Sequence, residues 1–398
     1  MIEINGKHNS AKIFTDNVEV TAMSQITELC NQEFTAGNKI RIMPDVHAGK
    51  GCTIGTTMTI TDKVVPNLVG ADIGCGLLVA FLNIDKSEIN FDQLDENIRL
   101  HIPSGQSIRE KEHRFVKLFK DFKDVKAPIN VNKANKSLGT LGGGNHFIEV
   151  NEVAPGKVAL VVHSGSRSLG GQIAKYYQNR AYDAITSVKG DQQRIIHELK
   201  AQGRHQEIEA ALKGVQKPKV KKELAYLEGE DFKNYLHDMK IAQQYAYFNR
   251  GAIITDIIDN MRWDYTYDRF FDTIHNYIDM DHMVLRKGAI SARKGEEVII
   301  PINMRDGSIL ATGKGNDDWN QSGPHGAGRL MSRTKAKENL NMADFFDTMD
   351  GVWTTSVGAG TLDEAPMAYK PMEAILDNIE DSLEVNKVIK PVYNFKAV

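Results

Sequence analysis

Cysteine is scarce in this chain. Only three cysteines occur among 398 residues, and no two of them form a CxxC pair. An odd number of scattered cysteines argues against a disulfide framework and against a zinc ribbon. We therefore expect Cys30 and Cys52 to be small buried apolar residues. Cys75 differs from them, because it lies between two glycines and three residues after Asp72.

The chain also lacks the segments that direct proteins to a membrane. Its first residues, MIEINGKHNS, contain no basic stretch followed by an apolar run, which is the pattern of a signal peptide. No apolar stretch approaches the roughly 20 residues that span a bilayer. We therefore expect a cytoplasmic protein without a membrane partner.

A large excess of one charge is absent as well. The formal net charge is −3, which does not indicate a protein that coats nucleic acid, although local basic patches are compatible with it. Hydrophobic residues make up 41% and charged residues 25% of the chain. This composition is ordinary for a globular protein.

Strand-like and helix-like patterns follow one another in blocks. Apolar runs bounded by glycine turns predict strands over the segments 39–44, 53–60, 77–83, 147–153, 157–164, 282–288, 297–303 and 308–313. Apolar residues at helical spacing predict a helix over 107–126, and residues 169–260 are predicted to be mostly helical, with a basic break at 214–222. Such blocks favour an α+β fold over a doubly wound sheet.

What the chain does contain is a set of histidines near small residues. Five of the 12 histidines lie in or beside runs of glycine and small residues: His47, His146, His163, His275 and His325. Glycine permits tight turns and close approach of the backbone to a ligand. Histidine is both a metal ligand and a nucleophile near neutral pH. Together with Asp72 and Cys75, the set indicates a metal-centred active site.

The turn Asp72-Ile73-Gly74-Cys75-Gly76 offers an oxygen donor and a thiolate, which three of the histidines could complete. This donor set suits Mn, Fe or Zn, and the thiolate favours Zn or Fe. One thiolate can bridge two metals, which gives a centre suited to phosphoryl transfer. The alternative for any single histidine is a core or capping residue.

Two glycine-rich loops could bind phosphate. The segment HSGSR at 163–167 offers hydroxyl groups and Arg167, whose planar fork matches phosphate oxygens. A helix that begins near residue 168 would point its first amides at the same place. The segment LGTLGGGNH at 138–146 adds Asn145. Either loop could also be a plain turn, and GKG at 49–51 lacks the spacing of a Walker A motif.

His325 has a different setting, GPHGAGRLMSR, with Arg329 and Arg333 after it. This layout suits a histidine that attacks phosphorus while arginines stabilise the developing charge. A further metal ligand or a turn residue is the alternative interpretation.

In combination, these motifs resemble a known family. MPDVHAGKG, GADIGCG, LGTLGGGNHFIE, HSGSRSLG, HN, RKGAISAR, HGAGRLMSRTKAK and PMAYK follow one another between residues 43 and 396. In this order they resemble the RtcB RNA-splicing ligases. The resemblance implies one catalytic domain over residues 1–398, with a helical segment at about 169–260 inside it. It also implies a mixed α+β fold in which central sheets surround a buried metal and nucleotide cleft.

The resemblance further implies a reaction. RtcB ligases join RNA that ends in a 2′,3′-cyclic phosphate or 3′-phosphate to RNA with a 5′-hydroxyl, in RNA repair or tRNA splicing, with GTP and two Mn²⁺ ions. The cyclic phosphate is opened, a histidine takes GMP from GTP, GMP moves to the RNA 3′-phosphate, and the 5′-hydroxyl displaces it. Capping with GMP supplies the leaving group that a 3′-phosphate lacks.

Roles transfer to residues by motif. His325 matches the guanylylated histidine, Arg167 the arginine that receives the RNA 3′-phosphate, and Asp45 an aspartate needed for activity. The implied metal ligands, with Cys75 bridging two Mn²⁺ ions, are Asp72, Cys75, His146, His163 and His275. The implied GTP contacts are Asn145, Glu149, Ser308, His325, Gly326, Ala327, Gly328, Arg329, Tyr369 and Lys396.

One loop departs from the family pattern. Residues 301–308 read PINMRDGS, where the family has P-G-S-M-G before a serine. We expect Ile302 and Arg305 to crowd a loop in which backbone meets triphosphate. The departure leaves two alternatives open: a metal-dependent RNA cyclic phosphodiesterase without efficient ligation, and a non-catalytic RNA-binding subunit.

RNA contacts have to be local, given the net charge of −3. Two basic segments are candidates, the helix expected over 107–126 and a lysine group formed by Lys213, Lys217, Lys219, Lys221 and Lys222. Either could instead be a solvated charged face.

Overall fold

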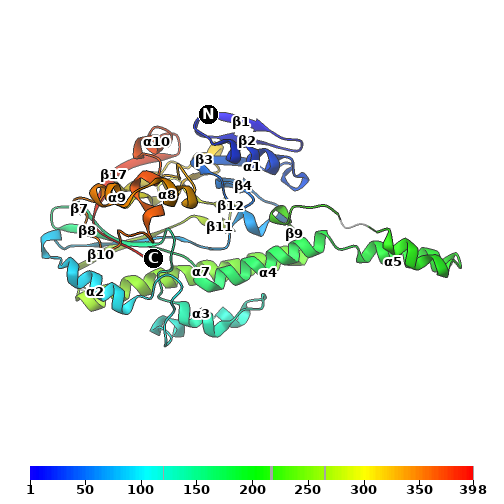
Figure 1. The fold of residues 1–398 in the computed structure, drawn as a ribbon, viewed down its shortest axis with the longest axis horizontal. Helices are drawn as coiled ribbons and strands as arrows, with labels where there is room; N and C mark the ends of the chain where they lie inside the picture. The colour runs from blue at the N-terminus through cyan, green and yellow to red at the C-terminus, as the bar shows by residue number, and fades with distance from the viewer. Residues whose placement is uncertain (120, 216–217, 264–265, 398) are drawn as a thin grey trace.

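Two large β-sheets form the centre of the structure, a computed structural model that describes residues 1–119, 121–215, 218–263 and 266–397 (Figure 1). The first sheet has the strand order β1-β2-β3-β4-β12-β11. Only β2 and β3 run parallel among its described pairs. Its strands are β1 (Ile2–Asn5), β2 (Ser10–Ile13), β3 (Ile40–His47), β4 (Ile54–Thr59), β12 (Val284–Lys287) and β11 (Asn276–Asp279).

The second sheet has the order β10-β6-β8-β7-β17-β15-β14, and its neighbouring strands pair antiparallel. Its inner strand β6 is buried along its whole length, in agreement with its continuous apolar sequence GLLVAFL. The strands are β10 (Tyr267–Ile274), β6 (Gly76–Leu82), β8 (Lys157–Ser164), β7 (Phe147–Ala154), β17 (Leu383–Lys396), β15 (Gly307–Gly313) and β14 (Glu297–Asn303). The predicted strands and the predicted α+β class are thus confirmed.

Two short strand pairs form separate two-stranded sheets beside the two large ones. β13 (Ala289–Ser291) pairs with β16 (Ser322–Pro324), and β5 (Lys63–Val64) pairs with β9 (Leu227–Glu228). β16 ends directly before His325, while β13 follows β12 after one glycine. The first pair therefore brings the His325 loop to the segment that follows β12.

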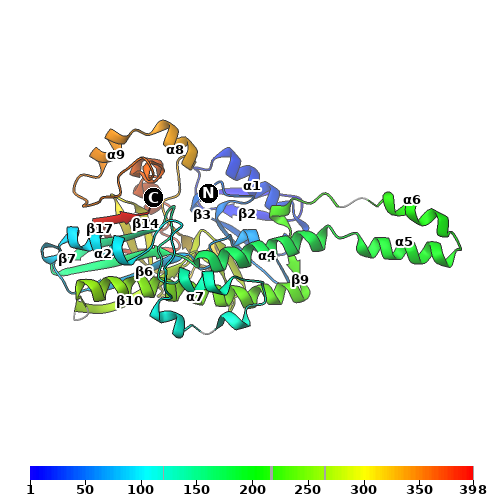
Figure 2. The same ribbon diagram turned by 60° about the horizontal axis from the view of Figure 1, so that its bottom comes forward.

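Two long helices lie side by side against the sheets, α4 (Arg167–Ile185) and α7 (Gly229–Met261) (Figures 1 and 2). α7 contacts β8 and β6, so its middle lies behind the second sheet. The helical prediction for 169–260, with a break at 214–222, is confirmed by α4, α5 (Lys189–Ala201), α6 (Ile208–Lys213) and α7.

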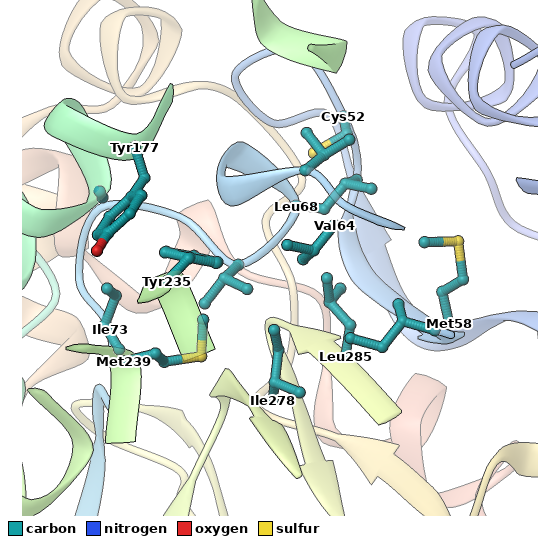
Figure 3. Close-up of a cluster of buried hydrophobic side chains, with 14 of the residues drawn as sticks. Cys52, Met58, Val64, Leu68, Ile73, Tyr177, Tyr235, Met239, Ile278 and Leu285 are labelled. Atoms are coloured by element: carbon teal, nitrogen blue, oxygen red, sulfur yellow. The ribbon is translucent and has the colours of Figure 1, made fainter. Parts of the chain in front are cut away.

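Figure 3 shows part of the apolar core between these helices and the first sheet. Tyr177 of α4 and Tyr235 of α7, whose ring centroids are 5.2 Å apart, belong to the same buried cluster as Ile278 of β11 and Leu285 of β12. Complete burial of one large apolar side chain stabilises a fold by roughly 1.5–3 kcal/mol. This core therefore fixes both helices against the strands that lead to the chemistry-bearing loops.

The other helices are short. α5 and α6 pack on each other and project away from the sheets (Figures 1 and 2). The remaining α-helices are α1 (Val20–Cys30), α2 (Phe91–His101), α3 (Val131–Ser137), α8 (Arg333–Asn339), α9 (Met342–Thr348) and α10 (Met372–Leu376). Among the described residues, no helix has the length and apolar character that a membrane span needs.

The helix predicted over 107–126 is wrong. Two 3₁₀ turns, Arg114–Lys117 and Asp121–Asp124, are found there instead, and Lys120 lies outside the described residues. Phe119 packs on Tyr245 and Phe248 of α7, with ring centroids 5.6 and 5.9 Å apart. These tertiary contacts outweigh a weak local helix preference, because short helices gain most of their stability from packing.

The two cysteines expected to be structural are both buried. Cys30 packs in the apolar core, as predicted. Cys52 is less apolar in its surroundings than expected, because the Lys287 ammonium lies 2.9 Å from its Sγ atom.

Candidate metal centre and nucleotide cavity

Three side chains form a buried cluster at one edge of the second sheet. Cys75 directly precedes β6, His163 is near the end of β8, and His146 directly precedes β7. Antiparallel pairing places these positions side by side. Cys75 Sγ lies 3.4 Å from His146 Nε2 and 3.3 Å from His163 Nε2. Their ligand atoms lie within 4.8 Å of one another, an arrangement suited to a metal ion.

Asp72 and His275 extend this cluster. Asp72 Oδ2 lies 2.9 Å from His146 Nε2, and His275 Nε2 lies 3.4 Å from His163 Nε2. The His275 backbone amide also donates to the Cys75 carbonyl over 2.9 Å. The structure thus brings together all five residues that the sequence predicts as metal ligands.

Backbone carbonyls orient two of the imidazoles. Nδ1 of His146 lies 2.9 Å from the Leu141 carbonyl oxygen, and Nδ1 of His163 lies 3.2 Å from the Asn145 carbonyl oxygen. A carbonyl accepts only from a protonated nitrogen, so each Nδ1 carries a hydrogen and Nε2 is the ring nitrogen that faces the cluster, where a bound cation would take its lone pair. Nδ1 of His275 is buried without a hydrogen-bond partner. The donors fit a metal ion in identity and in orientation.

Burial sets the protonation of the cluster. It lowers the pKa of His163 and of His275 well below the ordinary histidine value, so both imidazoles are neutral. Burial and the nearby Asp72 carboxylate raise the pKa of the Cys75 thiol. Burial also opposes ionisation of Asp72, but His146 outweighs it and lowers the Asp72 pKa to about 2. A bound cation would reverse the penalty on the thiolate.

Two glycines allow this close assembly. A Cβ atom at Gly165 would lie 2.1 Å from Asp72 Oδ1. A Cβ atom at Gly142 would lie 2.0 Å from Arg167 Nη1 and 2.7 Å from His146 Nδ1. Both distances are far below contact, so a side chain at either position would displace a cluster residue.

His325 lies beside the cluster and is held by Asp45. Asp45 Oδ2 accepts from His325 Nδ1 over 2.5 Å and from the His325 amide over 3.1 Å. The ring centroids of His325 and His275 are 4.9 Å apart. Since Nδ1 is engaged, Nε2 is the ring nitrogen left for attack. A Cβ atom at Gly328 would lie 2.4 Å from the Asp45 carbonyl, so the loop after His325 requires glycine there.

A cavity of about 640 Å³ opens next to His325. Cavities of roughly 300–1,000 Å³ are typical of small-ligand sites. His163 belongs both to the cluster and to the cavity wall. The sequence-predicted residues that line it are Asn145, Glu149, His163, His325, Gly326, Ala327, Gly328, Arg329, Tyr369 and Lys396. His47 also lines it, and its Nδ1 lies 2.9 Å from the Asp45 carbonyl.

Besides the other metal ligands and Asp45, which contacts His325, two predicted residues lie outside the residues that line this cavity: Ser308 and Arg167. Ser308 is in β15 between Pro301 and Ile389, and its buried Oγ has no hydrogen-bond partner. Arg167 begins α4, and its guanidinium donates to Thr140 Oγ1 and to the Gly105 carbonyl, each over 3.2 Å.

Glu364 is a cavity residue that sequence reasoning missed. Its carboxylate accepts from Lys396 Nζ over 2.6 Å and from the Tyr369 hydroxyl over 2.7 Å, and it pairs with Arg329 and Arg333. Burial opposes its ionisation, but Lys396 and Arg333 outweigh this and lower the Glu364 pKa to about 2. Its position five residues before Tyr369 is the signal that could have identified it.

Glu149 lines the same cavity, but its pKa is shifted in the opposite direction. It accepts from Asn394 Nδ2 over 2.6 Å, and Asn151 Nδ2 lies 3.4 Å away. Burial raises the Glu149 pKa to about 7, although Asn394 and Lys396 oppose the rise. Near neutral pH this carboxyl group can therefore either donate or accept.

The divergent loop forms a tight hairpin between β14 and β15. Asn303 Oδ1 accepts from the amides of Arg305 and Asp306 over 3.0 and 2.8 Å. Arg305 is exposed and pairs with Asp306, and it is not among the residues that line the cavity, although its neighbours Asn303 and Met304 are, so the expected crowding by Arg305 is not seen. Ile302 does line the cavity, with most of its side chain in the core.

The fold and the site define an α+β protein in which a candidate metal centre adjoins a cavity whose lining includes glycine and arginine residues. The family model for the tRNA-splicing ligase RtcB matches residues 25–129 and 123–397. The chain is 31% identical over 416 residues to the RNA-splicing ligase RtcB of Escherichia coli, covering 96% of this chain and 95% of the relative. It is 25% identical over 434 residues to the tRNA-splicing ligase RtcB of Methanococcus maripaludis, covering 87% and 85%. The chain belongs to the RtcB family.

Proposed function

We propose that this protein is an RNA ligase that joins RNA with a 2′,3′-cyclic phosphate or 3′-phosphate end to RNA with a 5′-hydroxyl end, using GTP and Mn²⁺. One observation carries the proposal. His325 is held through Nδ1 by the buried Asp45, lines the cavity, and lies beside the metal-ligand cluster. The names of the relatives support the ligase activity.

His325 is the proposed nucleophile. Asp45 accepts the Nδ1 hydrogen, which keeps the lone pair on Nε2. Nε2 forms a bond to the α-phosphorus of GTP, the bond from that phosphorus to the bridging oxygen breaks, and pyrophosphate leaves. Arg329 and Arg333 line the cavity and stabilise the charge that develops on the phosphates.

The metal centre is the second part of the proposal. Asp72, Cys75, His146, His163 and His275 would hold Mn²⁺, in agreement with their oriented donors. When bound, the metal supplies charge stabilisation to the phosphoryl oxygens and lowers the pKa of an attacking hydroxyl group. In the same proposal, Cys75 would also help to hold a second Mn²⁺.

The RNA end reacts after GMP is on His325. A 3′-phosphate oxygen bonds to the GMP phosphorus and the His325 Nε2–phosphorus bond breaks. The 5′-hydroxyl oxygen then bonds to the RNA 3′-phosphorus, loses its proton, and GMP leaves. Arg167 is the proposed contact of the RNA 3′-phosphate, since it lies over the Gly142 loop next to the cluster.

Tyr369, Glu149 and Lys396 of the cavity wall form the proposed guanine site. Tyr369 offers an aromatic face, and Arg329 lies 5.0 Å from its ring centroid. Glu149 and Lys396 offer a carboxyl group and an ammonium for the polar edge of the base. Ser308 stays a predicted contact that would require the β14–β15 hairpin to shift.

RNA contacts beyond the joined ends stay predictions. The segment around Arg114–Lys117 presents exposed basic residues, including Lys111, Lys117, Lys123 and Lys126. In the second candidate group, Lys213 pairs with Glu209 and Lys221 with Glu28, while Lys217 lies outside the described residues. A cytoplasmic location, a single domain over residues 1–398, and a role in RNA repair or tRNA splicing complete the proposal.

The direct test is covalent labelling. Wild-type protein is incubated with GTP radiolabelled at the α-phosphate and with Mn²⁺, then denatured and separated by electrophoresis. We expect label on the wild type and none on His325→Ala. The matched control is His282→Ala, which removes an exposed histidine that contacts Asp279 and should keep the label. Label that persists in His325→Ala would rule out the histidine–GMP step.

The two other activities have distinct outcomes in an assay with RNA bearing a cyclic phosphate. A cyclic phosphodiesterase gives 3′-phosphate RNA without joined product. A non-catalytic RNA-binding subunit gives neither product, and its RNA affinity does not change when the metal is removed.

A further inference from the structure

Helix α7 places two buried polar side chains directly behind the metal-ligand cluster. Asn249 and Arg250 are adjacent in its sequence, and both are 0% exposed. Neither belongs to the cluster itself. Arginine and asparagine are seldom fully buried unless their polar groups form hydrogen bonds or ion pairs. The partners of these two side chains therefore indicate their role.

Arg250 connects three ligand-bearing segments. Its Nη1 donates to the Gly74 carbonyl over 2.8 Å and to the Ser164 carbonyl over 2.9 Å. Its Nε and Nη2 bind both carboxylate oxygens of Asp272 over 2.8 and 2.6 Å. Gly74 directly precedes Cys75, Ser164 follows His163, and Asp272 lies three residues before His275. One guanidinium therefore holds the backbone beside two predicted ligands, Cys75 and His163, and a carboxylate three residues before the third, His275.

Asn249 connects two further segments. Its Oδ1 accepts from the amides of Gly139 and Thr140 over 2.8 and 3.1 Å. Its Nδ2 donates to Ser164 Oγ over 2.9 Å, to the Thr140 carbonyl over 3.1 Å and to the Gly165 carbonyl over 3.2 Å. This amide joins the glycine loop that leads to His146 to the turn after His163.

These segments need an outside support. They are turns rich in glycine, which has the largest backbone freedom of any residue. The cluster also requires close approach, as the 2.1 Å distance from a Cβ atom at Gly165 to Asp72 Oδ1 shows. A rigid 33-residue helix packed against β6 and β8 is well suited to fix such turns. Side chains on rigid elements orient metal ligands more accurately than loops alone do.

We propose that Asn249 and Arg250 are positioning residues that hold the ligand-bearing turns in metal-binding geometry, and so set the affinity of the cluster for a divalent cation. The inference rests on the proposed metal centre. It goes beyond the ligand set, because neither side chain would touch the ion. It also requires the planar fork of arginine, since a lysine at position 250 could not reach two carbonyls and a carboxylate together.

The competing explanation is that Arg250 only stabilises the fold. The chain contains a matched control, Arg286 of β12, which is also 0% exposed. Arg286 donates to Ser322 Oγ over 2.8 Å, to the Tyr277 hydroxyl over 2.9 Å and to two carbonyls of the 320–321 turn. It is as heavily bonded as Arg250, but its bonds bypass the turns that carry Cys75, His146 and His163.

The test compares metal binding in three full-length variants: Arg250→Lys, Asn249→Ser and Arg286→Lys. Each metal-free protein is titrated with Mn²⁺ by calorimetry, and its Tm is measured. We expect the Mn²⁺ Kd to rise about 10- to 100-fold in Arg250→Lys and in Asn249→Ser, as for other residues that orient ligands. Arg286→Lys should bind within about twofold of wild type, even where its Tm falls as far as that of Arg250→Lys.

A spectrum supplies a second measurement. Co²⁺ replaces Mn²⁺, and the thiolate-to-Co²⁺ absorption reports the geometry around Cys75. We expect a shifted or weakened band in Asn249→Ser, which decides the question if Arg250→Lys does not fold. Wild-type affinity and an unchanged band in both α7 variants would overturn the proposal, as would an equal loss of affinity in Arg286→Lys.

The same experiment separates this inference from the metal centre on which it depends. If wild type and Cys75→Ala bind Mn²⁺ equally, the cluster is not the metal site and the proposed function fails with it. If Cys75→Ala loses Mn²⁺ while both α7 variants keep it, the metal centre stands and only the positioning role is wrong.

Discussion

The metal-ligand cluster and the cavity beside it share His163, but they are held together in different ways. In the cluster, the backbone orients side chains, as the carbonyls of Leu141 and Asn145 orient two imidazoles. In the cavity, the cations Arg329, Arg333 and Lys396 gather around one carboxylate, Glu364. A metal ion would enter a geometry that exists before binding, whereas an anionic ligand would compete for cations that already have a partner.

Two buried carboxylates show how the cavity sets its charge. The Glu364 pKa falls to about 2, because the surrounding cations outweigh the cost of burial. The Glu149 pKa rises to about 7, because burial outweighs its amide and ammonium partners. One wall of the cavity is therefore permanently ionised, while the other changes charge near neutral pH.

The largest effect is expected from a substitution within the metal-ligand cluster. Cys75→Ala removes the ligand that contacts both His146 and His163, so we expect Mn²⁺ content to fall below detection and ligation to stop. Elemental analysis of the purified protein and a ligation assay measure these effects. The matched control is Cys30→Ala, which removes another buried cysteine from the apolar core on α1 and should keep its metal. Full Mn²⁺ content in Cys75→Ala would contradict the assignment of the cluster.

The next effect is on the cavity alone. Glu364→Ala leaves the buried Lys396 and the Tyr369 hydroxyl without their shared partner, so we expect the KM for GTP in the labelling reaction to rise roughly tenfold or more. Mn²⁺ content should not change. Asp363→Asn is the control, because Asp363 contacts Arg333 and Lys337 but not Lys396. Loss of metal in Glu364→Ala would show that the two regions are one coupled unit.

The cluster was predictable from sequence, while its supports were not. Its ligands stand in short motifs whose chemistry is local: a thiol and a carboxylate on one turn, and imidazoles beside glycine. Arg250 acts on the carbonyl of Gly74, 176 residues away, and no spacing in the sequence encodes that contact. Glu364 likewise accepts a hydrogen bond from Lys396, which is 32 residues away in the sequence. The prediction of a helix over 107–126 was wrong for the same reason, because packing on α7 determines the backbone conformation of this segment.

A smaller effect concerns the Glu149 wall of the cavity. The Glu149 pKa is near 4.5 when exposed and about 7 in the folded protein, so the native state binds more protons than the unfolded state between these values. Stability attributable to Glu149 therefore falls as pH rises from 4.5 to 7, and the penalty is complete above pH 7. Glu149→Gln removes it, and we expect a gain in unfolding free energy of at most about 3 kcal/mol at pH 8 that disappears at pH 4.5.

Denaturant unfolding at several pH values measures this gain. The control is Glu152→Gln on the same strand β7, where the carboxylate is partly exposed and pairs with Lys86. An exposed ion pair contributes about 0–1 kcal/mol, so Glu152→Gln should show no gain at high pH. A pH-independent effect of Glu149→Gln would contradict the role of burial.

The smallest expected effect concerns the divergent hairpin. Arg305→Ala removes an exposed side chain that pairs with Asp306 and is not among those that line the cavity, so we expect KM for GTP and Mn²⁺ content to stay within about twofold of wild type. Ile302→Gly changes a residue that does line the cavity, and it should alter KM for GTP more than Arg305→Ala does. The labelling reaction at increasing GTP concentration measures both. If Arg305→Ala changed KM more than Ile302→Gly, the hairpin would have to move onto the nucleotide, and the cavity would be even less preformed than the cluster beside it.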